Sequence, residues 1–506
     1  MKNTDPSIFD PKRRSRRLAG KLWSKNRHPA RSPEFEHIHL PDDGQVFLKP
    51  TEGALQRELR DCHPGQKDHA IAHFRRGEAL FRAWRYRESA QAYAHSGEDP
   101  ETVSALQSRG VALMMVSNLQ GAREAFEEGM SRAGHNHSAE WKLVCGIDLS
   151  QVWSDLGKGE CAKGVLRGVL DLARCLGDHS FEVVALTRLA FACFAQASYE
   201  EGMAYCDSAI RLAQHSDERI AQADALYAKG VLTMAKGDLA TAEKTLRSGI
   251  AVHTPDDRSC YTQTRILVQL SSLYTLMGRA DEAIAASENA LRLCAKQAHP
   301  QVKARCLQSL ALAHHSAGHR DAARSHSSQS LKADARAGYR RGIARTDLEC
   351  AKMALGNGQL AVARGFLGEA AETAGGTGHL VLHVQCKAFL AALSDDTSEI
   401  QKVAELEHLS EASAAAGLPL MEVLISELIG STYAEFARYP EAQTWFQAAA
   451  VQSRDLGCAL ELAKIYGLQA QLADRQGDRA AAVENAGLAD AVLDHAGIRR
   501  DGSIAG

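Results

Sequence analysis

Small residues recur every forty positions along most of the chain, typically five residues after a turn. Three series carry this register: Ala122, Ala162, Gly202 and Ala242; Ala283, Ala323 and Ala363; Ala442 and Ala482. The preceding turns hold Gly157, Gly237, Gly278, Gly318, Gly358 and Gly477, with Ala197 and Ala437 in place of glycine. A fixed period in the range of about 20–50 residues indicates stacked units, each too small to bury its apolar face alone. The register therefore predicts an extended binding surface rather than a central active site.

The prolines divide the chain into unequal parts. Seven of the 12 prolines lie in the first 66 residues, which leaves five for the following 440. Because proline interrupts helices, long helical arrays are expected only after residue 66. We expect a basic, Pro-rich and largely irregular segment over 1–66, a solenoid over 67–495 and a flexible tail over 496–506. A short hairpin is predicted within the first segment, where His37 and His39 alternate with apolar residues before Asp42-Asp43-Gly44.

The charge is distributed unevenly. Residues 1–31 carry ten Lys/Arg against two Asp, a net of +8, so the rest of the chain has a net of -11 from an overall -3. Nine of these cations lie in residues 11–31, a density that attracts the phosphates of nucleic acid or of an anionic surface. The candidate contact residues are Lys12, Arg13, Arg14, Arg16, Arg17 and Trp23. A solvated arm, or a helix that forms on docking to a partner, explains the same pattern.

Cysteine usage and hydropathy indicate the cellular compartment in which we expect the protein. The 12 cysteines are scattered without a Cys-x-x-Cys pair, as expected for small buried hydrophobes in a reducing environment. No apolar run approaches the roughly 20 residues of a transmembrane helix, and the amino terminus lacks the apolar core of a signal peptide. The expected location is therefore cytoplasmic, without a transmembrane segment.

One repeat, residues 223–250, shows the expected unit in detail. Leu226, Gly230 and Thr233 lie at helical spacing before the Gly237-Asp238 turn, after which Leu239, Ala242, Leu246 and Ile250 resume the spacing. Apolar or small residues at this spacing on both sides of a glycine turn predict a helical hairpin. A small residue is needed where two helices cross closely, which explains Gly230 and Ala242.

This unit resembles the tetratricopeptide repeat, whose pattern is W-x2-L-G-x2-Y, then A-x3-F, then P. The glycine of that pattern matches Gly77, Gly110, Gly230 and Gly430, and its later aromatic residue matches Tyr93, Phe126 and Phe446. About eleven repeats fit between residues 67 and 495, with a divergent one near 380–418. The resemblance implies an all-α, right-handed superhelix of about eleven helical hairpins.

Most repeats are 40 residues long instead of the usual 34 or so. This longer period resembles the sensor arms of bacterial signalling regulators. In those proteins an effector domain is attached, whereas here the repeats run towards the carboxyl end. The resemblance therefore implies an adaptor or sensor arm whose effector is a separate chain.

The most specific candidate binding pattern is a column of three arginines. Arg265, Arg305 and Arg345 are forty apart and share one phase, which in a tetratricopeptide array faces the concave groove. Lys464 holds the same phase in the last repeat, and Asp224 holds it in the repeat before Arg265. Such a column predicts charge-assisted hydrogen bonds to an acidic peptide. Alternatively, each arginine pairs with a neighbouring acid and contributes under about 1 kcal/mol.

Further residues are expected on the same face. Near the column they are polar or aromatic: Tyr227, Gln269, Gln308, Glu349 and Lys352. Nearer the amino end they are apolar: Phe74, Phe81, Met114, Met115, Phe191 and Phe194. The apolar set is interpreted first as ordinary packing, and as a surface for an amphipathic helix only if it is exposed.

No catalytic or cofactor motif is present in the sequence. There is no P-loop, no Gly-x-Ser-x-Gly and no His-Glu-x-x-His. His314, His315, His319 and His326 cluster in one repeat, but His315 and His319 straddle Gly318, so polar turn residues are favoured over a metal site. We therefore expect neither enzyme activity, metal nor cofactor, and predict a scaffold that binds a protein segment in its groove. The alternative is a ligand-responsive regulator that acts on nucleic acid through its basic tail.

Overall fold

The computed structural model describes residues 35–39, 46–50, 55–56, 58–59, 62–83, 85–96, 102–135, 139–216, 218–252, 260–295, 300–394 and 397–495. Among these residues two short strands, β1 (Phe35–His39) and β2 (Val46–Pro50), pair antiparallel with Ile38 opposite Phe47. All other regular elements are helices. The basic residues 11–31 and the tail 496–506 lie outside the described residues.

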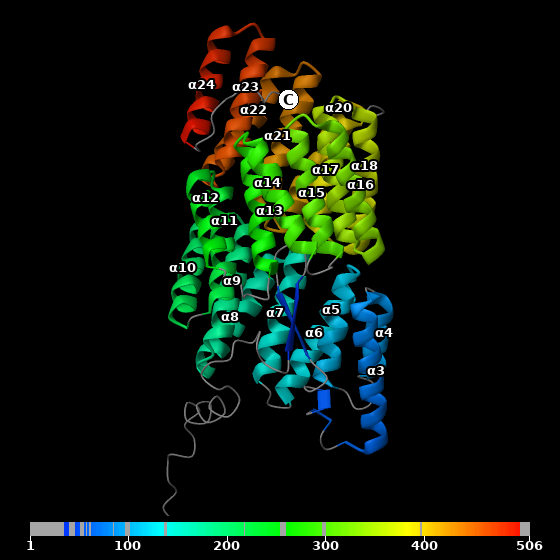
Figure 1. Ribbon diagram of the computed structural model, residues 1–506. Helices are drawn as coiled ribbons and strands as arrows, with labels where there is room; N and C mark the ends of the chain where they lie inside the picture. Colours follow the sequence, from blue (N-terminus) through cyan, green and yellow to red (C-terminus); the bar gives the residue numbers. More distant parts are fainter. Residues whose placement is uncertain are drawn as a thin grey trace, which may run out of the picture.

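Within the described ranges, twenty-two helices follow in chain order, and consecutive pairs form eleven antiparallel hairpins (Figure 1). The helices are α3 (Pro64–Arg82), α4 (Tyr86–Ser96), α5 (Val103–Met115), α6 (Leu119–His135), α7 (Ala139–Asp155), α8 (Gly159–Leu176), α9 (His179–Ala195), α10 (Tyr199–His215), α11 (Arg219–Ala235), α12 (Leu239–Ala251), α13 (Cys260–Leu276), α14 (Ala280–Ala295), α15 (Pro300–Ser316), α16 (Arg320–Ala337), α17 (Arg340–Gly356), α18 (Leu360–Thr377), α19 (Leu380–Leu393), α20 (Glu399–Ala415), α21 (Pro419–Glu435), α22 (Tyr439–Asp455), α23 (Ala459–Arg475) and α24 (Arg479–His495). The all-α solenoid of about eleven hairpins is confirmed.

The turns inside the hairpins use the left-handed backbone region. The predicted turn glycines have positive φ, for example +84° at Gly237 and +77° at Gly318. Ala197 and Ala437 adopt φ of 52° and 57° at the positions where they replace glycine. Since this region costs a residue with a Cβ roughly 1–2 kcal/mol, the surrounding hairpin must hold these alanines in place.

Close helix crossings explain the small residues of the first helices. A Cβ atom on Gly110 would lie 2.4 Å from the Phe126 ring, and one on Gly230 would lie 2.6 Å from Leu246. A Cβ atom on Gly430 would lie 2.7 Å from the Phe446 ring. In each case the contact joins residues sixteen positions apart, on the first and second helix of one hairpin. The glycine therefore permits the axial distance that the large apolar residue of the second helix requires.

The first helices of the hairpins form the inner layer of the superhelix. The first helices of successive hairpins contact one another along the array. For example, α9 contacts α11, α11 contacts α13, and α13 contacts α15. Second helices of successive hairpins have no comparable contacts among the described residues. Helices that approach at the smaller radius of a curved array lie on its concave side, so α5, α7 and the later odd-numbered helices face inwards.

The superhelix returns upon itself after six hairpins. The turn at Gly157 packs on Leu380 at the start of α19, and the turn at Gly237 packs on Ala459 at the start of α23. Figure 1 shows the result: α16 to α18 lie above α3 to α5, and α22 to α24 lie above α10 to α12. Successive superhelical turns are therefore in direct contact.

An ion pair reinforces this contact. Arg341 donates from Nη1 to Asp155 Oδ1 at 2.7 Å, and its backbone N–H donates to Ser117 Oγ at 3.3 Å. Asp155 also accepts from Gln151 at 2.8 Å. We call the pair of Asp155 and Arg341 the inter-turn clasp. It joins positions 186 apart in the sequence and fixes the pitch of the superhelix locally.

The segment before α3 contributes to the core. Leu55 and Leu59 are buried in the same apolar cluster as Phe74 and Tyr93. Glu58 accepts hydrogen bonds from the backbone N–H groups of Val103 and Ser104, which satisfies donors that the start of α5 would otherwise leave unpaired. No helix among the described residues is both long and apolar enough to span a bilayer.

Candidate binding site on the inner face

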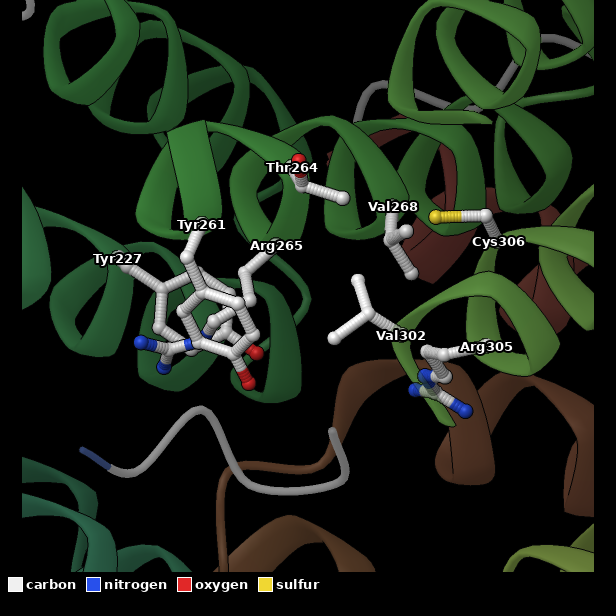
Figure 2. Close-up of a pocket in the computed structure, with 8 residues that line it drawn as sticks. All are labelled: Tyr227, Tyr261, Thr264, Arg265, Val268, Val302, Arg305 and Cys306. Atoms are coloured by element: carbon white, nitrogen blue, oxygen red, sulfur yellow. The ribbon is translucent and has the colours of Figure 1, made fainter. Parts of the chain in front are cut away.

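A small pocket opens between α11, α13 and α15 on the inner layer (Figure 2). Its wall is formed by Tyr227, Tyr261, Thr264, Arg265, Val268, Val302, Arg305 and Cys306. The pocket has a volume of about 20 Å³, enough for a water-sized molecule. Two arginines of the predicted column thus share one pocket with two tyrosines.

Arg265, the first member of the column, is held by its neighbours. Its Nη1 donates to Asp224 Oδ1 at 3.0 Å, and its guanidinium carbon lies 4.1 Å from the centre of the Tyr227 ring. Asp224 accepts a second hydrogen bond from Thr262 at 2.8 Å. Because Arg265 is 6 % exposed, this pair is a buried structural element as well as one wall of the pocket.

Arg305 and Arg345 share a neutral acceptor. Arg305 donates from Nη1 to Gln308 Oε1 at 3.0 Å, and Arg345 donates from Nε to the same oxygen at 2.9 Å. Burial lowers the pKa of Arg345 to about 10. Within the described part of the chain no carboxylate lies at ion-pair distance from Arg305. Two cations therefore converge on one amide oxygen that carries no compensating charge.

A buried acid lies near Arg305. Asp334 on α16 is 1 % exposed, and both of its carboxylate oxygens are without a hydrogen-bond partner. Burial raises the pKa of Asp334 well above its ordinary value, and the attraction of Arg305 opposes this only in part. Burial therefore favours the neutral form of Asp334 and weakens its compensation of the charge on Arg305.

The remaining predicted groove residues are engaged with neighbours. Gln269 Nε2 lies 3.3 Å from Met234 Sδ, and Lys352 pairs with Glu349 at 3.1 Å. Lys464 pairs with Glu427 at 2.7 Å on the last two first helices. The geometry thus brings Tyr227, Arg265, Arg305, Arg345 and Gln308 together and leaves Gln269, Lys352 and Lys464 at other points along the inner layer.

The apolar residues expected on the amino-terminal part of this face belong to the core. Phe74, Phe81, Met114 and Met115 are buried, and Phe191 and Phe194 are half-buried against the neighbouring clusters. The first interpretation, ordinary packing, therefore describes them, and the docking surface for an amphipathic helix is not available there. In the described chain no group of three or more His, Cys, Asp or Glu could hold a metal ion. His314 Nδ1 lies 3.3 Å from His319 Nδ1 in the turn of its hairpin.

Five residues of the pocket were not predicted from the sequence: Tyr261, Thr264, Val268, Val302 and Cys306. Tyr261 lies one turn before Arg265 on α13, while Val302 and Cys306 flank Arg305 on α15. The available signal was helical spacing, since positions three or four apart share a face. The tail residues Lys12 to Arg17 and Trp23 lie outside the described residues.

A second polar cluster on the inner layer predicts a pH effect. Asp148 on α7 accepts from Gln107 Nε2 at 2.5 Å, and burial raises its pKa to about 8. An unfolded chain loses this proton near pH 4, so the folded state binds the extra proton between about pH 4 and 8. The stabilisation by this bound proton is complete below about pH 4 and is lost as the pH rises through about 8.

Asp148→Asn keeps the acceptor for Gln107 but cannot titrate. We therefore expect the melting temperature of this variant, relative to the unsubstituted protein, to increase between about pH 5 and pH 8 and to level off above pH 8, where Asp148 is ionised in both states. The measurement is a series of thermal melts, with Asp321→Asn on the exposed face of α16 as the control. A difference for Asp148→Asn that stays constant with pH, as expected for the control, would show that the carboxyl group does not retain its proton.

These features define a class: a helical-hairpin solenoid whose inner layer is polar and, around one pocket, cationic. Residues 262–336 match the family model described as tetratricopeptide repeat, and they include both Arg265 and Arg305. Residues 262–336 are thus similar to tetratricopeptide repeats, and the other described hairpins have the same helical architecture. No curated protein matches the chain by sequence.

Several solved structures share the repeat architecture. The Rap conjugation gene regulator of plasmid pLS20, in complex with the Phr* peptide, is 13% identical with a TM-score of 0.44, covering 55% of this chain and 75% of its own. A Rap protein complexed with competence and sporulation factor is 12% identical, with a TM-score of 0.41 and coverage of 67% and 99%. Yeast Tom70 is 12% identical, with a TM-score of 0.35 and coverage of 86% and 98%. At these values the likeness concerns the fold alone.

Proposed function

We propose that the protein is a non-catalytic interaction scaffold that binds an anionic segment of a partner protein on its inner face at Arg305. The observation that carries this proposal is the shared acceptor. Arg305 and Arg345 both donate to Gln308 Oε1, and burial favours the neutral form of the nearby Asp334. A carboxylate or phosphate of the partner supplies a negative charge to Arg305, which has no carboxylate at ion-pair distance among the described residues, through charge-assisted hydrogen bonds of about 1.5–3 kcal/mol each.

The neighbouring side chains support recognition of a chain segment rather than a free ion. Tyr227 and Tyr261 line the same pocket as Arg305, and their rings lie beside the guanidinium of Arg265 (Figure 2). Arg265 is fixed against Tyr227 and Asp224, so the wall of the site is preorganised. A rigid wall lowers the entropy lost on binding, which favours affinity.

Affinity purification with the full chain as bait tests the proposal. We expect partners captured by the unsubstituted protein to be lost with Arg305→Glu, because one charge-assisted bond is removed and a repulsive carboxylate is introduced. Arg324→Glu is the matched control, since Arg324 is 77% exposed on the second helix α16. Bound proteins are identified by mass spectrometry after nuclease treatment. The same set of captured proteins with all three baits would contradict the proposal.

We propose a separate role, contact with nucleic acid, for the basic tail. Contact with nucleic acid through residues 11–31 is supported by nine cations without an acid. Binding of a DNA duplex to the full chain, with a steep decrease in added salt and a complete loss on removal of residues 1–31, would support this role. Capture of partners at Arg305 should survive the same truncation.

A further inference from the structure

Two cysteines meet at the wall of the pocket. Cys294 on α14 and Cys306 on α15 are both buried in one apolar cluster with Tyr261 and Val302. Their thiols are hydrogen-bonded to each other, although the residues lie on different helices. Cys306 also lines the pocket beside Arg305. The pair is thus both preassembled and adjacent to an opening on the inner face.

We propose that Cys294 and Cys306 form an oxidisable dithiol, a site that takes hydrogen peroxide and closes to a disulfide between α14 and α15. The inference is independent of the partner proposed above. Cys306 lines the pocket, so a small oxidant reaches the pair from this side, whereas the burial of both sulfurs hinders a bulky disulfide such as oxidised glutathione.

The electrostatic surroundings assign the roles of the two sulfurs. The hydrogen bond from Cys306 lowers the pKa of Cys294, and the charge of Lys303 acts in the same direction. The pKa of Cys306 is raised by the same hydrogen bond and by burial. Because the thiolate is the nucleophile, Cys294 reacts first and Cys306 resolves the product.

The chemistry balances without a cofactor. The Cys294 thiolate attacks one oxygen of peroxide, the O–O bond breaks, and the leaving hydroxide takes up the proton that the thiol released, forming water and a sulfenic acid. The Cys306 sulfur then attacks the Cys294 sulfur and loses its proton. The S–O bond breaks, a second water leaves and the S–S bond forms. Two thiols lose two electrons, and peroxide is reduced to two waters.

Peptide mapping of the full chain tests the site. The two thiols that are exposed among the described residues are removed in a Cys161→Ser/Cys175→Ser background, which reduces crosslinks between molecules. The folded protein is treated with hydrogen peroxide, quenched with catalase, denatured, alkylated and digested with trypsin. We expect a disulfide joining residues 293–296 to residues 306–320, reversed by dithiothreitol. Replacement of the resolving cysteine, Cys306→Ser, should instead leave Cys294 as a sulfenic acid that dimedone traps.

Two comparisons make the result decisive. Cys193 and Cys206 are equally buried on the neighbouring helices α9 and α10, and they should remain fully alkylatable. Oxidised glutathione should form the crosslink at least tenfold more slowly than peroxide. The proposal is overturned if Cys294 and Cys306 stay reduced under peroxide, if Cys193 and Cys206 oxidise at the same rate, or if both oxidants are equally fast. Circular dichroism before and after treatment establishes that the reaction occurred in the folded protein.

Discussion

Arg341→Ala is expected to lower the free energy of unfolding by about 3–5 kcal/mol, the range found when one partner of a buried ion pair is removed. Arg341 and Asp155 are 19% and 5% exposed in the inter-turn clasp, so Asp155 would be left as a buried charge that has lost this cationic partner. The contact joins two superhelical turns, and its loss should therefore also increase the radius of gyration. Thermal melting and small-angle X-ray scattering measure the two effects.

The neighbouring arginine provides the control for the clasp. Arg340 is exposed at the start of the same helix, so Arg340→Ala should leave both the melting temperature and the scattering curve unchanged. Adding Asp155→Asn to Arg341→Ala should restore part of the lost stability, because it removes the buried charge. If Arg341→Ala and Arg340→Ala behave alike, the turns of the superhelix are not held together by this pair.

Gly110→Val is expected to destabilise the protein by about 1–3 kcal/mol, the usual cost of overpacking a tight core. The first atom of the new side chain would lie 2.4 Å from Phe126, which is fully buried and cannot move aside without displacing α6. Gly168→Val on α8 is the control, because no heavy atom lies within 4 Å of the position where its Cβ would stand. There the higher helix propensity of valine should produce a small gain of a few tenths of a kcal/mol. Melting temperatures that fall equally for both variants would mean that the close crossing of α5 and α6 is not the cause.

The repeat architecture could be predicted because it depends on local spacing. Gly110 and Phe126 are sixteen residues apart, and their contact is fixed within a single hairpin. The left-handed turns at Ala197 and Ala437 followed from the same register, since each stands where other repeats have glycine. Both features require only the geometry of one hairpin, which the periodic pattern determines.

The inter-turn clasp could not be predicted from that pattern. Asp155 and Arg341 meet only because the small rotation between successive hairpins adds up to one superhelical turn over six of them. No local spacing encodes this sum, which depends on many packing angles together.

The arginine column was predicted only in part. Its three arginines lie on the inner helices α13, α15 and α17, and their role in binding stays a prediction. The sequence already placed Asp224 at the equivalent position one repeat before Arg265, where the two pair. The sharing of Gln308 by Arg305 and Arg345 depends instead on side-chain conformations at the contact between α15 and α17. The burial of the inner face, which turns an expected open groove into a small pocket, depends on how tightly the first helices approach one another.

Titration of a captured partner segment onto the full chain tests the central claim most directly. The segment is prepared as a synthetic peptide, and its dissociation constant is measured by calorimetry for the unsubstituted protein, Arg305→Glu and Arg324→Glu. Binding on the inner face predicts a dissociation constant at least tenfold higher for Arg305→Glu, an unchanged value for Arg324→Glu and equal melting temperatures for all three proteins. Equal affinities for the unsubstituted protein and Arg305→Glu would contradict the assignment of the site.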